Sequence, residues 1–70
     1  LYFTTSDKLC KVRDNKRSEN EVVYHDPNSD FDGLVWDGNN NIYFCDKEQD
    51  RIMCFDMESN NTNIFLDCVY

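Results

Sequence analysis

The stretch FDGLVWDGNNNIYFCDKEQDRIMCFD, residues 31–56, decides the fold. Its β-branched and aromatic residues gather into three short runs, at residues 31–36, 41–45 and 51–55, and Gly, Asn and Asp separate these runs. The runs are strand-sized, and the residues between them are the types that tight turns prefer. No part of the stretch sustains the i, i+3, i+4 spacing of an amphipathic helix. The stretch therefore predicts three β-strands joined by turns.

The rest of the chain has the same pattern. Further strand-sized runs cover residues 1–4, 9–13, 21–25 and 62–66, and turn-forming residues such as those at 27–29 separate them. No run has the length and spacing of a helix of three turns. The predicted fold class is all-β, with seven strands.

Three short segments of the first half recur in the second half, at offsets of 41, 43 and 41 residues. A period of about 40 to 45 residues with four short strands is typical of one blade of a β-propeller. The sequence therefore predicts consecutive propeller blades. The matching segments are residues 1–3 and 42–44, residues 8–9 and 51–52, and residues 22–26 and 63–67.

On this interpretation residues 1–26 supply strands two to four of one blade, residues 31–66 supply a complete four-stranded blade, and residues 67–70 begin the next connection. Residues 31–36 form the innermost strand, where Gly33 either lets neighbouring backbones approach closely or forms a simple bulge. Two blades cannot close a ring, so the expected partners are the remaining blades of the same or a cleaved chain. We expect both ends of the sequence to lie inside a longer protein.

Burial is expected to follow the period of two that a sheet covered on both faces imposes. Phe44, Val35 and Ile52 are predicted to lie in the layer between blades. Residues 47–49 are predicted to be exposed, as part of a solvated charged turn at residues 46–50.

The charge of the chain excludes some classes of partner. Fourteen acidic against seven basic residues give a formal net charge of −7. That charge repels phosphate backbones and anionic lipid surfaces, so neither nucleic acid nor a membrane is an expected partner. No apolar run approaches the roughly 20 residues needed to span a bilayer. Solubility accounts for the charge, and a cationic ligand is the sharper alternative.

The four cysteines favour an oxidising compartment, because scattered thiols in secreted chains are commonly paired. Cys10, Cys45, Cys54 and Cys68 are the disulfide candidates, and four cysteines permit three connectivities, which the sequence leaves open. No pair has the C-x-x-C spacing of a zinc site and His25 is the only histidine, so no metal or other cofactor is expected.

Residues 60–62 (NNT) form an N-glycosylation sequon with Asn60 as the acceptor. Such triplets also arise by chance in Asn-rich stretches. Secretion would nevertheless account for both the sequon and the four cysteines. The sequence therefore predicts a secreted, extracellular protein.

The hairpin motifs resemble those of a known family. Residues 42–44 (IYF) are followed, ten residues after their Phe, by residues 54–56 (CFD), and residues 1–3 (LYF) and 9–12 (LCKV) form a similar preceding hairpin. This pattern resembles the Yellow and major royal jelly protein family of insects, over nearly all of this chain but a small part of a full-length member. Two features depart from the family pattern. The CFD triplet replaces Cys-Trp-Asn, and the other three cysteines are not required by the family.

The resemblance implies a secreted, non-catalytic β-propeller of six blades, of which this chain is a fragment just under two blades long. It also implies that the axial channel holds a small-molecule ligand, with a biogenic amine as the expected class. In the family, the cysteine that matches Cys54 is bridged toward the C-terminal part, which implies a partner outside this chain.

Asp30, Phe31 and Asp32 are the candidate ligand-binding residues, because they stand where the innermost strand begins. Carboxylates and an aromatic ring hold a cationic amine by ion pairing and cation–π contact. The alternative is that an Asp before a strand is a turn or capping residue. We expect Trp36 to be a core residue packed between blades.

Two other functions stay open. A calcium-dependent enzyme of the gluconolactonase type would take oxygen ligands from several blades, and this chain would contribute one or two, such as Asp32. No catalytic triad is legible, and His25 is interpreted as a surface residue. A free-standing small β domain held by disulfides is the third possibility.

Overall fold

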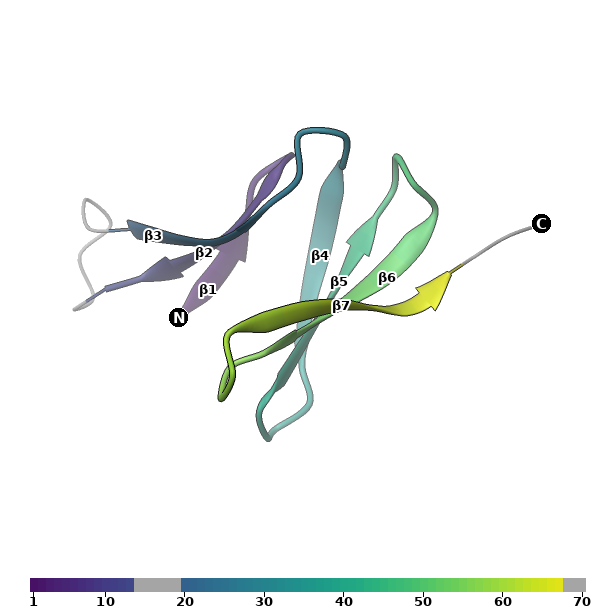
Figure 1. Cartoon of the computed structure of the whole chain (residues 1–70). Helices are drawn as coiled ribbons and strands as arrows, with labels where there is room; N and C mark the ends of the chain where they lie inside the picture. The colour runs from purple at the N-terminus through teal and green to yellow at the C-terminus, as the bar shows by residue number, and fades with distance from the viewer. Residues whose placement is uncertain (14–19, 68–70) are drawn as a thin grey trace.

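The computed structural model describes residues 1–13 and 20–67, which form two antiparallel sheets (Figure 1). The strand orders are β1-β2-β3 and β4-β5-β6-β7. The all-β prediction is confirmed for these residues, and each strand begins and ends within one residue of its predicted run. In the described part of the chain, no helix is long and apolar enough to cross a membrane. The strands are β1 (Tyr2–Thr4), β2 (Lys8–Val12), β3 (Asn20–His25), β4 (Phe31–Trp36), β5 (Asn41–Asp46), β6 (Arg51–Asp56) and β7 (Asn61–Asp67).

The three-stranded sheet repeats the last three strands of the four-stranded sheet. The β1–β2 hairpin has the same register as the β5–β6 hairpin, because Tyr2 pairs with Lys11 in the first and Tyr43 pairs with Cys54 in the second. These pairs reproduce the predicted offsets of 41 and 43 residues. The repeat seen in the sequence is therefore also a repeat of backbone pairing.

The last strands of the two sheets, β3 and β7, correct one predicted offset. His25 pairs with Lys8 on β2, and Asp67 pairs with Arg51 on β6, so the offset between β3 and β7 is 42 residues and not 41. Both sheets shift register at the equivalent point of this pairing, which inserts one extra residue into β3 and one into β7. Matching by residue type cannot place such a bulge. The extra residues are Val23 and Phe65.

A layer of aromatic and aliphatic side chains lies between the two sheets. Phe31 and Phe44 meet edge to face with ring centroids 5.0 Å apart, and Tyr24 of the first sheet packs against them at 5.9 and 6.4 Å. Tyr2 packs against Phe55 at 5.8 Å. Tilted and edge-to-face contacts are those that the charge distribution of aromatic rings favours. The buried members of the layer are Leu9, Phe31, Ile42, Phe44, Met53 and Phe55.

The opposite face of the four-stranded sheet is open. Strand alternation turns Val35 and Ile52 to that face, away from Phe44. Phe44 is buried as predicted, but Val35 is 65% exposed and Ile52 is half-buried, so the prediction that all three share one layer is wrong. In the β5–β6 turn, Lys47 and Glu48 are exposed as predicted, whereas the residue that follows them is half-buried.

Gly33 forms a bulge in β4. The register between β4 and β5 shifts between Asp32 and Val35, and Gly33 has a φ of +69°, in the left-handed region that glycine enters readily. A Cβ at this position would meet no atom within 4 Å. Of the two roles left open for Gly33, the structure shows the bulge, whereas a close approach to the equivalent strands of other blades stays a prediction.

We expect Phe44→Ala to lower the free energy of unfolding by about 3–5 kcal/mol, because it empties the centre of the layer between the sheets. Phe65→Ala is the matched control, since Phe65 is 60% exposed on the open face and packs against Tyr43 at 4.9 Å. Its removal should cost about 1 kcal/mol. Urea denaturation measures both costs. Equal costs for the two variants would contradict the assignment of Phe44 to a closed core.

Candidate binding site at the start of β4

The candidate site lies where the chain enters β4, beside the end of β5. The two strands are antiparallel, so Asp30 comes next to Lys47, whose backbone amide donates a hydrogen bond to the Asp30 carbonyl oxygen at 2.8 Å. Asp30 and Asp32 are two residues apart in an extended segment and therefore share a face. Lys47 Nζ lies 3.9 Å from Asp30 Oδ2 and 3.6 Å from Asp32 Oδ2. The site thus holds one primary ammonium between two carboxylates.

This ion cluster is weakly held. The side chains of Asp32 and Lys47 are largely exposed to solvent, and that of Asp30 is about half exposed. Exposed ion pairs of this kind contribute less than about 1 kcal/mol each, because water screens the charges. Two carboxylates and one ammonium leave the cluster with a net negative charge. An incoming cation therefore has little to displace.

Phe31 does not join these carboxylates. It lies between Asp30 and Asp32 in the sequence, and strand alternation turns its side chain to the other face of the sheet. There it is buried against Phe44 and Tyr24. Of the three predicted ligand-binding residues, the structure brings Asp30 and Asp32 together and assigns Phe31 to the core.

Asp46 is a buried polar residue that the sequence reasoning missed. It was expected in the solvated turn, yet only 1% of it is exposed. Asp46 ends β5 and continues the inward alternation of Ile42 and Phe44, which is the signal that could have revealed it. Its carboxylate accepts four hydrogen bonds. The donors are Ser29 Oγ at 2.7 Å, Arg51 Nε at 3.0 Å, the Asp30 amide at 3.1 Å and the Gln49 amide at 3.3 Å.

Arg51 extends this cluster to the connection between the sheets. Arg51 Nη2 donates to Asp26 Oδ2 at 3.0 Å, and Gln49 Nε2 donates to the same oxygen at 3.1 Å. Asp26 follows β3, whereas Arg51 and Gln49 belong to the β5–β6 hairpin. The cluster therefore fixes the connection against the second sheet. It also holds the backbone of Asp30, and thereby positions the candidate site.

The carboxylates of the cluster are stabilised in their ionised form. Burial alone raises the pKa of Asp46, but hydrogen bonds from Ser29, a backbone amide and Arg51 outweigh burial and hold the pKa below its ordinary value. The pKa of Asp26 is also lowered, first by the hydrogen bond from the Asn28 amide. Both groups therefore carry a negative charge at neutral pH.

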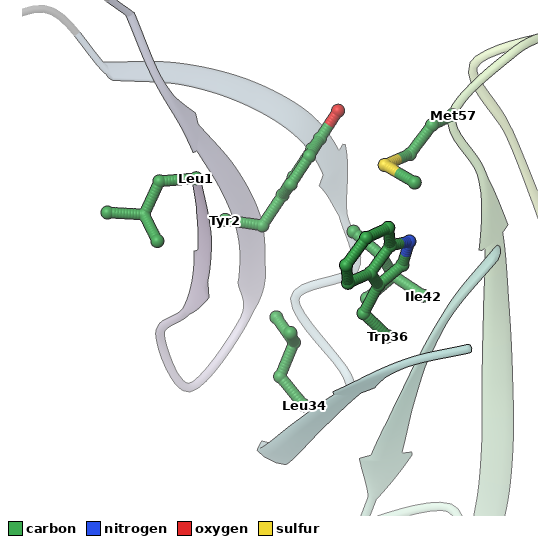
Figure 2. Close-up of a pocket in the computed structure, with 6 residues that line it drawn as sticks. All are labelled: Leu1, Tyr2, Leu34, Trp36, Ile42 and Met57. Carbon is green, nitrogen blue, oxygen red and sulfur yellow. The ribbon is translucent and has the colours of Figure 1, made fainter. Parts of the chain in front are cut away.

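A pocket lies at the other end of β4. It is an apolar pocket of about 310 Å³, in which Tyr2, Trp36 and Met57 converge (Figure 2). Trp36 Nε1 donates to the Asn39 carbonyl oxygen at 2.7 Å, which fixes the indole ring. Trp36 is 61% exposed, so the prediction that it is a core residue is wrong. The lining residues are Leu1, Tyr2, Leu34, Trp36, Ile42 and Met57.

The disulfide candidates are not paired in the described part of the chain. Cys10 is buried, Cys45 is exposed and Cys54 is half-buried, and none of the three forms a disulfide. Desolvation raises the pKa of the Cys10 and Cys54 thiols. Cys68 lies outside the described residues.

The remaining predicted residues lie at the surface. Asn60 is exposed, with a φ of 58°, in the turn between β6 and β7. His25 is exposed and its Nε2 lies 3.0 Å from Asp7 Oδ2. Across residues 1–13 and 20–67, no three His, Cys, Asp or Glu side chains gather in a group that could hold a metal ion.

We expect Asp46→Asn to lower the free energy of unfolding at pH 7 by about 3 kcal/mol, because Arg51 then faces a neutral amide in a buried cluster. The folded pKa of Asp46 lies below its unfolded value. The contribution of its charge is therefore present above the unfolded pKa of about 4 and is lost as the pH falls through the folded pKa. The gap between wild type and variant should narrow below about pH 4.

Denaturant unfolding at a series of pH values measures this gap. Asp50→Asn is the matched control, because Asp50 is exposed in the same hairpin and the substitution removes the same charge. The control should stay within about 0.5 kcal/mol of wild type at every pH. A gap for Asp46→Asn that is independent of pH would mean that its carboxylate charge is not what the cluster stabilises.

Comparisons with known proteins add no assignment. The chain matches no protein-family model, no curated protein and no solved structure.

Proposed function

We propose that the chain forms two successive blades of a secreted, non-catalytic β-propeller of the Yellow and royal jelly type. In this proposal the propeller has six blades and binds a small cationic ligand, a biogenic amine, beside the start of β4. The partners of the chain are the remaining blades and the ligand. The observation that carries the ligand assignment is the Lys47 ammonium between the carboxylates of Asp30 and Asp32.

The propeller part of the proposal is supported by the two faces of the repeat. Four residues of the first sheet belong to the buried layer between the sheets or pack against it. The equivalent positions of the second sheet all carry apolar or aromatic side chains, and they lie on its open face. The first sheet contributes Tyr2, Leu9, Val23 and Tyr24, and the equivalents are Tyr43, Ile52, Phe65 and Leu66.

This equivalence favours a third sheet on the open face. A face that carries the same kinds of side chain at the same positions is suited to the same packing against the next unit. Such contacts join unlike faces, and head-to-tail contacts generate a closed ring when the rotation between units allows it. A propeller is the ring of sheets that this geometry produces.

The ligand class follows from the chemistry of the candidate site. Lys47 occupies it with the functional group that a primary amine carries. Because the cluster is exposed and has a net negative charge, a free amine can take the place of the lysine. The formal charge of −7 on the whole chain favours approach of a cation. Phe31 is buried, so the carboxylates alone account for the attraction.

Secretion is supported by the position of Asn60. A glycan acceptor must project from the surface, and Asn60 stands at an exposed turn between two strands. A glycan there would extend away from the layer between the sheets.

We expect Asp32→Asn to weaken amine binding by about 1–3 kcal/mol, because the ammonium loses a charged hydrogen-bond partner. Lys47→Met should strengthen binding, because it removes the competing internal ammonium. Titration calorimetry with serotonin, dopamine and histamine measures both changes, and Asp50→Asn controls for the loss of one negative charge elsewhere. Equal affinities of wild type and Asp32→Asn would remove Asp32 from the site, and no heat with any of the three amines would remove the amine assignment.

A further inference from the structure

The first sheet ends at an open edge on β1. Among the described strands, β1 pairs with β2 alone. The Leu1 carbonyl accepts from the Val12 amide at 2.8 Å, and the Thr5 amide donates to the Lys8 carbonyl at 2.9 Å. Successive peptide groups of a strand point to opposite sides. The backbone N–H and C=O groups of Tyr2 and Thr4 lie between these two contacts. They therefore point away from β2, toward the open edge.

The second sheet has a strand at the equivalent edge. The residues of β5 that match Tyr2 and Thr4 are Tyr43 and Cys45, and both are paired with β4. Val35 is the β4 residue opposite Tyr43. Because the two sheets share the same register, the edge of β1 has the backbone geometry that already holds a strand in the neighbouring unit.

The apolar pocket lies beside this edge. Leu1 and Tyr2 of the β1 side form one part of its wall, and Leu34 and Trp36 of β4 form another part (Figure 2). Leu1 is 84% exposed and Trp36 is 61% exposed, so apolar surface is open to water on both sides. Exposed apolar patches beside unpaired strand edges are typical of interaction sites.

We propose that the edge of β1 and this pocket together accept one further β-strand with a sequence like that of β4. The strand runs antiparallel to β1, as β4 runs antiparallel to β5. Its residue opposite Tyr2 corresponds to Val35 and shares the face of Tyr2, so its side chain enters the pocket. Main-chain hydrogen bonds supply the affinity, and the aliphatic side chain supplies the register.

The docked strand is a partner for the repeat on which the proposed function also rests, but its docking does not depend on ring closure or on a ligand. It concerns the edge of the first sheet, whereas the third sheet of the ring would cover the open face of the second. The two proposals can therefore fail separately.

The test fuses a copy of residues 31–41 directly before Leu1, which reproduces the connection between β4 and β5. In the copy, tryptophan is replaced by phenylalanine, so that Trp36 remains the one tryptophan. Hydrogen exchange at the Tyr2 and Thr4 amides should slow at least about 10-fold, because both become paired in the sheet. The fluorescence emission of Trp36 should shift to shorter wavelength, and acrylamide should quench it less, because the pocket around the indole ring is filled.

Two control fusions separate strand docking from a mere extension of the terminus. In the first, one asparagine is deleted from the turn of the copy, which shifts the strand by one residue and turns its apolar side chains to the wrong face. In the second, the valine that enters the pocket is replaced by aspartate. Both should leave exchange at Tyr2 and Thr4 fast and Trp36 accessible.

Unchanged exchange in the fusion of correct register would overturn the inference, and so would equal protection in the shifted fusion. Amine binding and the exposure of Phe65 on the open face serve as the separate readouts of the proposed function. Neither should respond to the fused strand.

Discussion

The aromatic layer between the two sheets is the contact on which the rest of the structure depends. A sheet of three or four short strands has no core of its own, and it becomes stable when one face packs against another element. Tyr24 of the first sheet meets Phe31 and Phe44 of the second, and this contact sets which face of each strand is inward. The outward direction of Asp30 and Asp32 follows from the inward direction of Phe31.

A buried charge cluster sets how the chain passes from one sheet to the next. Asp46 and Arg51 of the second sheet hold the connection that follows β3. The equivalent positions of the first sheet are Thr5 and Lys8, which lack the carboxylate. Lys8 instead pairs with Asp7 at the surface. The cluster therefore belongs to the junction within this chain, whereas the aromatic layer belongs to the repeat.

The sequence predicted the strands and their repeat because alternation and turn residues are local signals. Residues whose environment depends on register were harder to predict. Asp46 was placed with its charged neighbours in a turn, although one more step of alternation turns it inward. The position of Trp36 far along β4 favours a core residue, but Trp36 lies at the rim of a pocket whose edge carries no strand among the described residues. Phe31 was grouped with two carboxylates from which alternation separates it.

The central claim is that the two sheets are successive units of one repeat whose open face is suited to packing against a third. The most direct measurement is the cost of Phe65→Ala in a chain of residues 1–67 followed by a second copy of residues 26–67. Under this claim we expect the cost to rise from about 1 kcal/mol to about 3–5 kcal/mol, because the added sheet buries the Phe65 ring as the second sheet covers its equivalent, Val23. A cost that stays near 1 kcal/mol, with the added unit unfolding independently, would contradict it.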